Sequence, residues 1–390
     1  MPDIPLRIGL IGVEHRARMA SNWHDDPRAQ IVAGCDIDDE FLGRFQEKHK
    51  DTFTCNDYRD LVARDDVDAV GVFTRDNLHA EHAVAALEAG KHVFCEKPMA
   101  IHTEDCDRML EAWRQSGTRF MVGMNMRYMD NFIALKDVID SGQIGEVKAV
   151  WVRHFVGFGG FAYFHDYRAN SKGSTGLLLQ KASHDFDMIH FLTGRYTKRV
   201  TGMGSLDFFG GDKPNDLVCE DCDEKDTCTE FSTREKKSMC CFRQEVDVED
   251  HSMVLLDLGN VRAAYVQCHY ATETNRNYLL IGTKGKAELT GNEIKVTTQR
   301  VNKTKARSDS HFATATIQVG AVQGGHGGAD PRICRQFLDH VLDNAPTVAT
   351  PRDGRMAVAV GCAATHSIRN GNVPIDITPC PELTTSSDIP

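Results

Sequence analysis

The chain has 390 residues, of which 41% are hydrophobic and 26% are charged, an ordinary composition for a globular protein. This length allows about two or three domains, each able to bury its own core. The formal net charge of -11 argues against a general nucleic-acid-binding or anionic-membrane-binding protein. The expected partners therefore include no nucleic acid and no membrane.

The cysteines and the N-terminal segment indicate the compartment. The 13 cysteines are an odd number, and many of them fall in predicted core or helical segments, which favours reduced thiols over a disulfide framework. The N-terminal segment runs directly into an apolar strand, so no signal peptide is expected there. No apolar run reaches the length of a transmembrane helix. The sequence therefore predicts a cytoplasmic protein.

From Leu6 to about Gly123, short apolar runs alternate with helical stretches. Continuous apolar runs of this kind are typical of parallel strands buried on both faces. The predicted strands are Leu6–Gly12, Ile31–Asp36, Ala69–Thr74, His92–Cys95 and Phe120–Met124. The predicted helices are 16–24, 40–48, 58–63, 79–89 and 103–116. This series predicts an α/β domain with a doubly wound parallel sheet of the Rossmann type, which we assign to residues 1–125.

After residue 145 the pattern changes to closely spaced strands joined by turn signals such as Gly259–Asn260. Such runs indicate an antiparallel sheet. Strands are predicted at 146–155, 246–257, 261–270, 277–282 and 286–289, and helices at 183–192, 332–342 and 356–369. Residues 126–390 are therefore predicted to form an α+β domain with a large open, mainly antiparallel sheet. A cysteine-rich insertion interrupts this domain at about 212–243.

The turn after the first strand partly matches a dinucleotide-binding fingerprint. The full pattern would place glycines at positions 12, 14 and 17, but only Gly12 is present, with Ala17 as a tolerated substitute. Glu14 departs from the pattern, because its carboxylate would repel a pyrophosphate. Asp36 supports the interpretation, because an acid about 20 residues further on hydrogen-bonds the ribose diol and favours NAD over NADP. The alternative role of Asp36 is to cap the helix that follows.

A charged pair and a proline, Glu96-Lys97-Pro98, follow the short strand His92–Cys95. Pro98 removes a backbone donor and disfavours helix at Lys97, so the strand ends there. Ligands of open α/β sheets bind at the carboxyl ends of the strands, so Lys97 is well placed to meet a substrate. By itself the pair could be a solvated strand end. The strand order and the Glu-Lys-Pro segment together resemble the Gfo/Idh/MocA family of nicotinamide-dependent sugar and polyol oxidoreductases, over nearly the whole chain.

The resemblance implies where a nicotinamide cofactor would bind. The segment from Thr74 to His79 is similar to the family's Thr-Pro-x-x-x-His, with Arg75 in place of proline, and it lies beside the nicotinamide in the family. Asn77 in this segment has the alternative role of a turn or helix cap. NAD is the expected cofactor, with NADP as the alternative. The expected cofactor-binding residues are Gly12, Val13, Glu14, Asp36, Thr74, Asn77, His79, Glu96, Lys97 and Asn125.

A predicted helix carries a second group of polar residues. His184 and Asp187 are three residues apart and share a face, so Asp187 could orient His184. An imidazole titrates near neutrality, which suits reversible proton transfer. In the family the matching histidine takes the alcohol proton and the matching lysine contacts the reacting hydroxyl. The resemblance therefore implies that Lys97 and His184 are catalytic, with Asp187 beside them. Gln180 stands where the family's polyol dehydrogenases usually have aspartate, and it cannot take a proton.

Several polar and aromatic residues are expected to face the substrate. The family commonly has an Asn-x-Arg-aromatic sequence like the one around Arg127, although Arg127 could instead pair with an acid between the domains. The loop before the His184 helix is polar and aromatic, which suits a sugar but also a subunit contact. The expected substrate-binding residues are Arg127, Tyr128, Tyr163, Arg168, Gln180, Lys181 and His184.

A glycine-rich loop and a cysteine cluster complete the candidate features. Residues 324–331 are predicted as a loop that ends in a helix start, capped by Asp330, from which His326 could reach the pocket. The cysteine cluster could hold a structural zinc ion tetrahedrally or be a polar insertion with free or redox-active thiols. The predicted zinc ligands are Cys219, Cys222, Cys228 and Cys240.

The sequence therefore predicts an NAD(P)-dependent oxidoreductase acting on a secondary alcohol of a sugar, glycoside or cyclitol. Two alternatives stay open: an NAD-dependent glycoside hydrolase that works by transient oxidation and elimination, and a non-enzymatic sugar or nucleotide sensor. The resemblance also implies a homodimer or homotetramer formed through the exposed sheet of the second domain.

Overall fold

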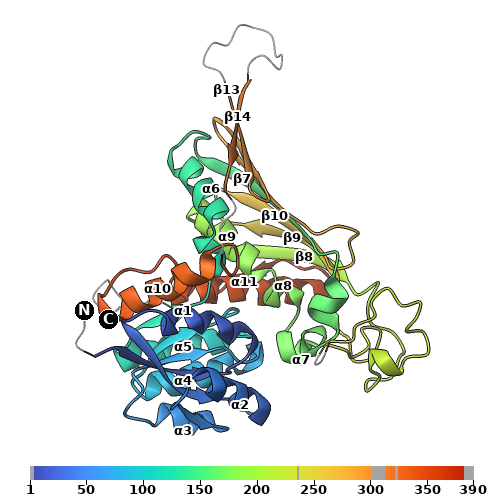
Figure 1. Ribbon diagram of the computed structural model, residues 1–390. Coiled ribbons are helices and arrows are strands. Elements are labelled where there is room, and N and C mark those ends of the chain that lie inside the picture. Colours follow the sequence, from blue (N-terminus) through green and yellow to red (C-terminus); the bar gives the residue numbers. More distant parts are fainter. Residues whose placement is uncertain (1–3, 235–236, 300–311, 321–323, 382–390) are drawn as a thin grey trace, which may run out of the picture. The chain divides into compact units, whose positions relative to one another are not determined.

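The computed structural model describes residues 4–234, 237–299, 312–320 and 324–381 (Figure 1). The chain divides into two compact units. The first comprises Met1–Met129, Val322–Val358 and Cys380–Pro390, and the second comprises Asp130–Ala321 and Ala359–Pro379.

The first unit is built on a six-stranded parallel sheet with the strand order β3-β2-β1-β4-β5-β6. This order is the doubly wound arrangement of dinucleotide-binding folds, so the predicted α/β class is confirmed. The strands are β1 (Leu6–Ile11), β2 (Ala29–Cys35), β3 (Phe53–Cys55), β4 (Ala69–Val72), β5 (His92–Cys95) and β6 (Phe120–Val122). Strand β3 was not predicted, because three residues with a threonine between them give no apolar run.

Helices and short 3₁₀ turns connect these strands (Figure 1). Asp38 caps α2 by accepting hydrogen bonds from two backbone N–H groups, and Gly117 ends α5 with φ +68°. The elements in the first part of the unit are η1 (His15–Ala20), α1 (Ser21–His24), α2 (Asp39–Lys48), α3 (Tyr58–Val62), η2 (Asp76–Leu78), α4 (His79–Glu88), α5 (Thr103–Ser116) and η3 (Asn125–Tyr128). Later elements are α10 (Ala329–Leu342) and the start of α11 (Pro351–Arg369).

Helix α10 belongs to the core of the first unit. Its Phe337 packs against Trp23 and Phe94, with ring centroids 5.3 Å and 5.7 Å apart, and all three side chains are fully buried. The Trp23 indole N–H donates to the carbonyl of Cys334 in the same helix at 3.0 Å. Burying each such large side chain contributes about 1.5–3 kcal/mol. This packing places 322–358 in the first unit, whereas the sequence analysis assigned the whole of 126–390 to the second domain.

The second unit contains a nine-stranded sheet in the order β14-β13-β12-β11-β7-β10-β9-β8-β15. Its pairs are antiparallel except for β7 with β10, so the predicted open, mainly antiparallel sheet is confirmed. The strands are β7 (Val147–Phe155), β8 (Arg199–Ser205), β9 (His251–Asp257), β10 (Arg262–Cys268), β11 (Asn275–Gly282), β12 (Gly285–Thr290), β13 (Glu293–Gln299), β14 (Phe312–Gln318) and β15 (Ile375–Asp376).

Two differences from the predicted second domain have a local cause. Strand β8 was not predicted, because Gly202 and Gly204 interrupt its apolar pattern. Strand β14 was not predicted either, because all of its side chains are exposed and its residues show no buried face. The helical elements of this unit are α6 (Asp130–Asp140), η4 (Gly160–Phe164), η5 (Tyr167–Ala169), α7 (Ser171–Ser174), α8 (Leu177–Gln180), α9 (Ser183–Thr193) and η6 (Cys219–Asp221), and α11 ends here.

Within the described residues, no helix is long and apolar enough to cross a lipid bilayer. All 13 cysteines lie in the described part of the chain, and none of them forms a disulfide bond.

Candidate active site

The turn after β1 is shaped for close backbone approach. Gly12 has φ +82°, and a Cβ on it would lie 2.9 Å from the backbone of Phe73, so only glycine fits. The backbone N–H of Val13 donates to the Asp36 carboxylate at 3.1 Å. Asp36 therefore lies at this turn, and the helix that follows is capped by Asp38 instead. The helix-cap alternative for Asp36 does not apply.

Glu14 does not present an isolated negative charge at this turn. Its carboxylate pairs with Arg18 at 2.5 Å and lies 4.0 Å from Arg44. Burial by itself would raise the pKa of Glu14, but the Arg18 hydrogen bond, the His15 backbone N–H and the two guanidinium charges outweigh it, so the pKa is lowered. The two arginines offset the repulsion that the carboxylate would exert on a pyrophosphate.

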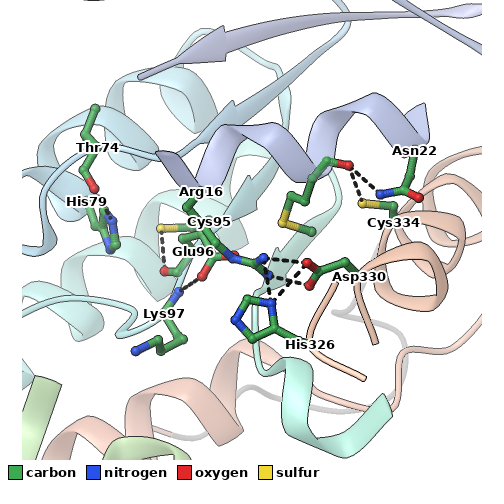
Figure 2. Close-up of polar contacts among 11 residues, drawn as sticks. Arg16, Asn22, Thr74, His79, Cys95, Glu96, Lys97, His326, Asp330 and Cys334 are labelled. Carbon is green, nitrogen blue, oxygen red and sulfur yellow. Dashed lines mark hydrogen bonds and ion pairs between the residues drawn. The ribbon is translucent and has the colours of Figure 1, made fainter. Parts of the chain in front are cut away.

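The segment after β4 is tied to the segment after β5 by a buried histidine. The His79 ring is 1% exposed and lies 3.1 Å from the backbone carbonyl of Thr74 (Figure 2). Its other ring nitrogen lies 2.7 Å from the backbone carbonyl of Pro98. The Thr74 hydroxyl lies 3.0 Å from Nδ1 of His82. Asn77 is exposed in the short η2 turn between them. His79 thus holds the backbone at Pro98, the residue that follows Lys97.

Glu96, the residue before Lys97, holds the backbone on the other side of the lysine. Its side chain is 6% exposed, and one carboxylate oxygen accepts from Nε of Arg16 at 2.6 Å. The other oxygen accepts from the backbone N–H of Lys97 at 3.0 Å. Figure 2 shows the Lys97 side chain extending away from this group. The lysine therefore stands at the carboxyl end of β5, between two fixed points of the backbone.

Asp330 does not cap α10, because the helix begins one residue earlier and its N-cap residue is Gly328. Its carboxylate instead accepts two hydrogen bonds from Arg16, at 2.7 Å and 2.8 Å, and lies 3.1 Å from Nδ1 of His326 (Figure 2). Burial by itself would raise the pKa of Asp330, but His326 and Arg16 outweigh it and hold the pKa well below its usual range. The predicted cap is wrong, since the side chain has a stronger charged partner.

The η3 turn after β6 holds three predicted site residues in different environments. Asn125 is 4% exposed, and its side-chain oxygen has no hydrogen-bond partner within the described residues. Arg127 pairs with Asp353 at 3.0 Å and donates to a backbone carbonyl. Asp353 belongs to the same unit, so this partner is not the acid between the domains that the alternative role of Arg127 required. The Tyr128 hydroxyl donates to the side chain of Gln336.

Three features of the first unit suit a bound dinucleotide. They are the close backbone approach at Gly12, the Asp36 carboxylate beside the Val13 amide, and the buried Asn125 oxygen. An unmet buried acceptor costs about 1–3 kcal/mol. A ligand that donates an N–H to Asn125 would remove that cost.

In the second unit, the predicted proton-transfer residues lie on α8 and α9. Gln180, His184 and Asp187 are all at most 7% exposed. The Lys181 ammonium lies 5.9 Å from the centre of the Tyr163 ring. His190 lies further along α9 and accepts from the backbone N–H of Thr197 at 3.2 Å, so its role is structural.

Asp185, beside His184, is a buried anchor that the sequence analysis missed. Its carboxylate is fully buried and accepts hydrogen bonds from side chains on two strands of the sheet, β10 and β11: Tyr265 at 3.2 Å, Arg276 at 3.0 Å, and Tyr278. The His154 ring lies 3.2 Å away. Burial by itself would raise the pKa of Asp185, but Arg276, His154 and Tyr278 outweigh it, so the pKa is lowered. The carboxylate thus ties α9 to the sheet.

The polar-aromatic loop before α8 is largely internally bonded. Tyr163 is 7% exposed, and burial raises the pKa of its hydroxyl. The Arg168 guanidinium pairs with Asp166 at 2.5 Å and stacks on Tyr167, with 4.9 Å from its carbon to the ring centre. Arg168 therefore already has an acidic partner within its own loop.

Each unit thus brings together one part of the predicted site. In the first unit, Glu96, Lys97, Thr74 and His79 lie near the ends of β4 and β5, while Gly12, Val13 and Asp36 meet at the ends of β1 and β2. In the second unit, Gln180, His184 and Asp187 lie on two successive helices, and Lys181 lies in the turn between them. The pairing of Arg16 with Asp330 was not predicted, because these residues are 314 positions apart. The role of Asp185 was not predicted either, because its partners are on distant strands.

The cysteine-rich insertion does not support the predicted zinc site. Within the described residues, no group of three or more His, Cys, Asp or Glu side chains is arranged to hold a metal ion. A tetrahedral zinc needs sulfurs about 2.3 Å from one point. Here the four thiols are among the residues that line a cavity of about 220 Å³. In the absence of a metal ion, burial raises the pKa of Cys219 and Cys240.

The fold and these residues define a class: a protein with a dinucleotide-binding Rossmann unit and a second unit with an open sheet. Comparison with known sequences gives the family. The profile "Oxidoreductase family, NAD-binding Rossmann fold" matches residues 6–124, and the family's C-terminal alpha/beta domain matches residues 136–377. The chain belongs to the Gfo/Idh/MocA oxidoreductase family, which confirms the resemblance found in the sequence.

Individual relatives carry names within this family. An inositol 2-dehydrogenase of Salmonella typhimurium is 34% identical over 198 residues, which cover 50% of this chain and 54% of that protein. The match thus spans about half the length of this curated relative. A levoglucosan dehydrogenase solved with NADH has a TM-score of 0.77 at 18% identity, covering 96% of this chain and all of that one. An oxidoreductase domain protein of Kribbella flavida has a TM-score of 0.78 at 20% identity, with 96% and 99% covered. These structures share the fold.

Proposed function

We propose that this protein is an NAD-dependent dehydrogenase that oxidises a secondary alcohol of a sugar, glycoside or cyclitol. The observation that carries the proposal is the set of groups at one edge of the parallel sheet. Gly12, Asp36 and Lys97 follow the carboxyl ends of β1, β2 and β5, where open α/β sheets bind their ligands. Asp36 supports NAD over NADP, because its carboxylate would repel a ribose phosphate.

The residues divide the chemistry between them. NAD, when bound, accepts the hydride from the carbinol carbon. Lys97 binds the oxygen of that carbon and stabilises the negative charge that develops on it. His184 takes the hydroxyl proton as a general base, and Asp187 orients it from the same helix. Gln180 offers hydrogen bonds to further hydroxyl groups without taking a proton.

The substrate class is proposed from the relatives and from the side chains present. The relatives named above include an inositol 2-dehydrogenase and a levoglucosan dehydrogenase, whose names point to a cyclitol and an anhydrosugar. Amide, ammonium and phenol groups at Gln180, Lys181 and Tyr163 suit a polyhydroxylated ring, because each hydroxyl needs a donor or an acceptor. The polyol is therefore the expected small-molecule partner.

The experiment is to mix the purified protein with NAD and a panel of inositols, anhydrosugars and glycosides, and to follow NADH formation. Wild-type protein is expected to reduce NAD with at least one member, and Lys97→Ala and His184→Ala are each expected to lose about 10²–10⁴-fold in kcat. His190→Ala is the matched control on the same helix. Unchanged turnover in both site variants would contradict the assignment, and aglycone release without net NADH would favour the hydrolase alternative.

We also propose that the exposed face of the nine-stranded sheet joins subunits into a homodimer or homotetramer. Leu255 and Trp151 lie in one cross-strand row through Ala264, and they are 61% and 46% exposed. Met203 pairs with Met253 on the same face, and they are 64% and 59% exposed. A contiguous apolar face of this kind marks an interaction surface.

Substitution on this face tests the proposed assembly. Leu255→Lys is expected to lower the molecular mass measured by light scattering, because a charge would be buried at the contact. Val373→Lys, at an exposed position in the same unit, is the control. An unchanged mass for Leu255→Lys would count against this face as the interface.

A further inference from the structure

We propose that Arg16 is a positioning residue that keeps the Glu96 carboxylate engaged, so that the neighbouring Lys97 ammonium is directed to substrate and not to Glu96. Asp330 holds the Arg16 guanidinium in place for this task. The inference deepens the proposed function and rests on it for the role of Lys97, but it can be measured without substrate or cofactor.

The Arg16 guanidinium uses two different edges. Its Nε edge donates to Glu96 at 2.6 Å, and its two terminal nitrogens donate to the two oxygens of Asp330 at 2.7 Å and 2.8 Å (Figure 2). The planar fork of arginine matches a carboxylate in this bidentate way, whereas a lysine ammonium would not. The Arg16 side chain is 24% exposed, and its two carboxylate partners are 6% and 9% exposed. Asp330 thus sets the plane from which Nε meets Glu96.

Both oxygens of the Glu96 carboxylate have a donor. Arg16 takes one, and the backbone N–H of Lys97 takes the other at 3.0 Å. Without Arg16, the cation nearest in sequence to this buried carboxylate is the ammonium of Lys97 itself. A buried carboxylate attracts an available cation strongly, because little solvent screens it. Arg16 therefore competes with Lys97 for Glu96.

The backbone on the other side of Lys97 is held independently. The His79 ring contacts the Pro98 carbonyl at 2.7 Å, so removing Arg16 leaves this anchor in place. His326 lies 3.1 Å from Asp330 and from Arg16. If Arg16 is lost, we expect the Lys97 ammonium to pair with Glu96, while the backbone at Lys97 keeps its position.

The direct test is trace acylation of the ligand-free protein with acetic anhydride at one pH, with the rate at Lys97 measured by peptide mass spectrometry relative to Lys148. In Arg16→Met, the Lys97 rate is expected to fall by about threefold to tenfold, because a freed Glu96 and a lost neighbouring cation both favour the unreactive ammonium. Arg7→Met is the matched control, since Arg7 forms a similar bidentate pair with Asp68 in the same unit. It is expected to leave the Lys97 rate unchanged.

A rescue variant separates positioning from general stabilisation. In Arg16→Met/Glu96→Gln, the amide cannot attract the ammonium, so the Lys97 acylation rate is expected to return to the wild-type value or above it. Because Arg16→Met leaves two buried carboxylates without a cation, the same series is repeated in an Asp330→Asn background. An unchanged Lys97 rate in the Arg16 variants, or no return with Glu96→Gln, would overturn the proposal.

Kinetics provide the second readout. Arg16→Lys is expected to lower kcat by about tenfold while the dissociation constant of NADH, measured by fluorescence, changes less than about twofold. Equal losses in both would indicate a merely structural role. Failure of the acylation test overturns the role of Arg16 and leaves the dehydrogenase assignment standing. Absence of NAD reduction in wild-type protein overturns that assignment and leaves the acylation result readable.

Discussion

The segment that carries Lys97 and the helix that carries His184 are anchored in different ways. Lys97 follows Glu96, whose carboxylate is held by a partly exposed arginine that reaches a second carboxylate on another segment. His184 precedes Asp185, a fully buried carboxylate with hydrogen-bond donors on two strands, β10 and β11. The first arrangement is a chain of ion pairs, and the second is one anion inside a shell of donors. Substitution in the first should therefore cost less folding stability than substitution in the second.

The largest expected effect is on the buried anchor. Asp185→Ala should lower the free energy of unfolding of the second unit by about 3–5 kcal/mol, because Arg276 would be left as an uncompensated charge. Denaturant titration measures this change. Tyr278→Phe, which removes one donor only, should cost about 1–2 kcal/mol. A loss below 1 kcal/mol for Asp185→Ala would mean that the carboxylate does not anchor α9.

The pH dependence of the free energy of unfolding should also depend on the buried groups around Asp185. Burial and the Arg276 charge lower the pKa of His154 from 6.5 to about 4. Between these values the unfolded chain binds a proton that the folded chain does not, so stability falls as the pH drops through this window. The contribution of His154 is at most about 3.4 kcal/mol. Denaturant titrations at pH 7 and at pH 4.5 should therefore differ more for wild type than for His154→Gln, and equal differences would contradict the assignment.

The ion-paired region responds at lower pH. Asp330 has a lowered pKa in the folded state, so its contribution is present above its ordinary pKa of 3.8 and is lost as the pH falls below that value. Asp330→Asn should therefore flatten the stability profile below about pH 4 and leave the window above it unchanged. The same titrations, extended to pH 3, test this. If Asp330→Asn instead changed the free energy of unfolding only above pH 4, the ion-paired region would not be the one that responds at lower pH.

The smallest expected effect concerns cofactor choice in the first unit. Asp36→Ala should raise the KM for NAD by about tenfold, since one hydrogen-bonded ribose contact is worth about 1.4 kcal/mol. It should also narrow the preference for NAD over NADP. Initial rates with both cofactors measure the ratio. An unchanged ratio would remove Asp36 from the ribose site.

The sequence predicted those parts of the fold and site whose signal is local. The parallel sheet follows from continuous apolar runs, and Lys97 was placed because Pro98 ends its strand. Strand β3 and the glycine-containing β8 have no such run and were missed. The anchors were missed for a different reason. Whether Asp330 caps a helix or binds Arg16 depends on a residue 314 positions away, and no local pattern encodes that contact.

The most direct measurement of the central claim is isotope transfer from substrate carbon to cofactor. The wild-type protein is incubated with NAD and an inositol or anhydrosugar deuterated at each ring carbon, and the cofactor is analysed by mass spectrometry. The account predicts NADH that carries one deuterium, formed by wild type and reduced by at least about 100-fold in Lys97→Ala. NADH without deuterium, or equal transfer by Lys97→Ala, would contradict it.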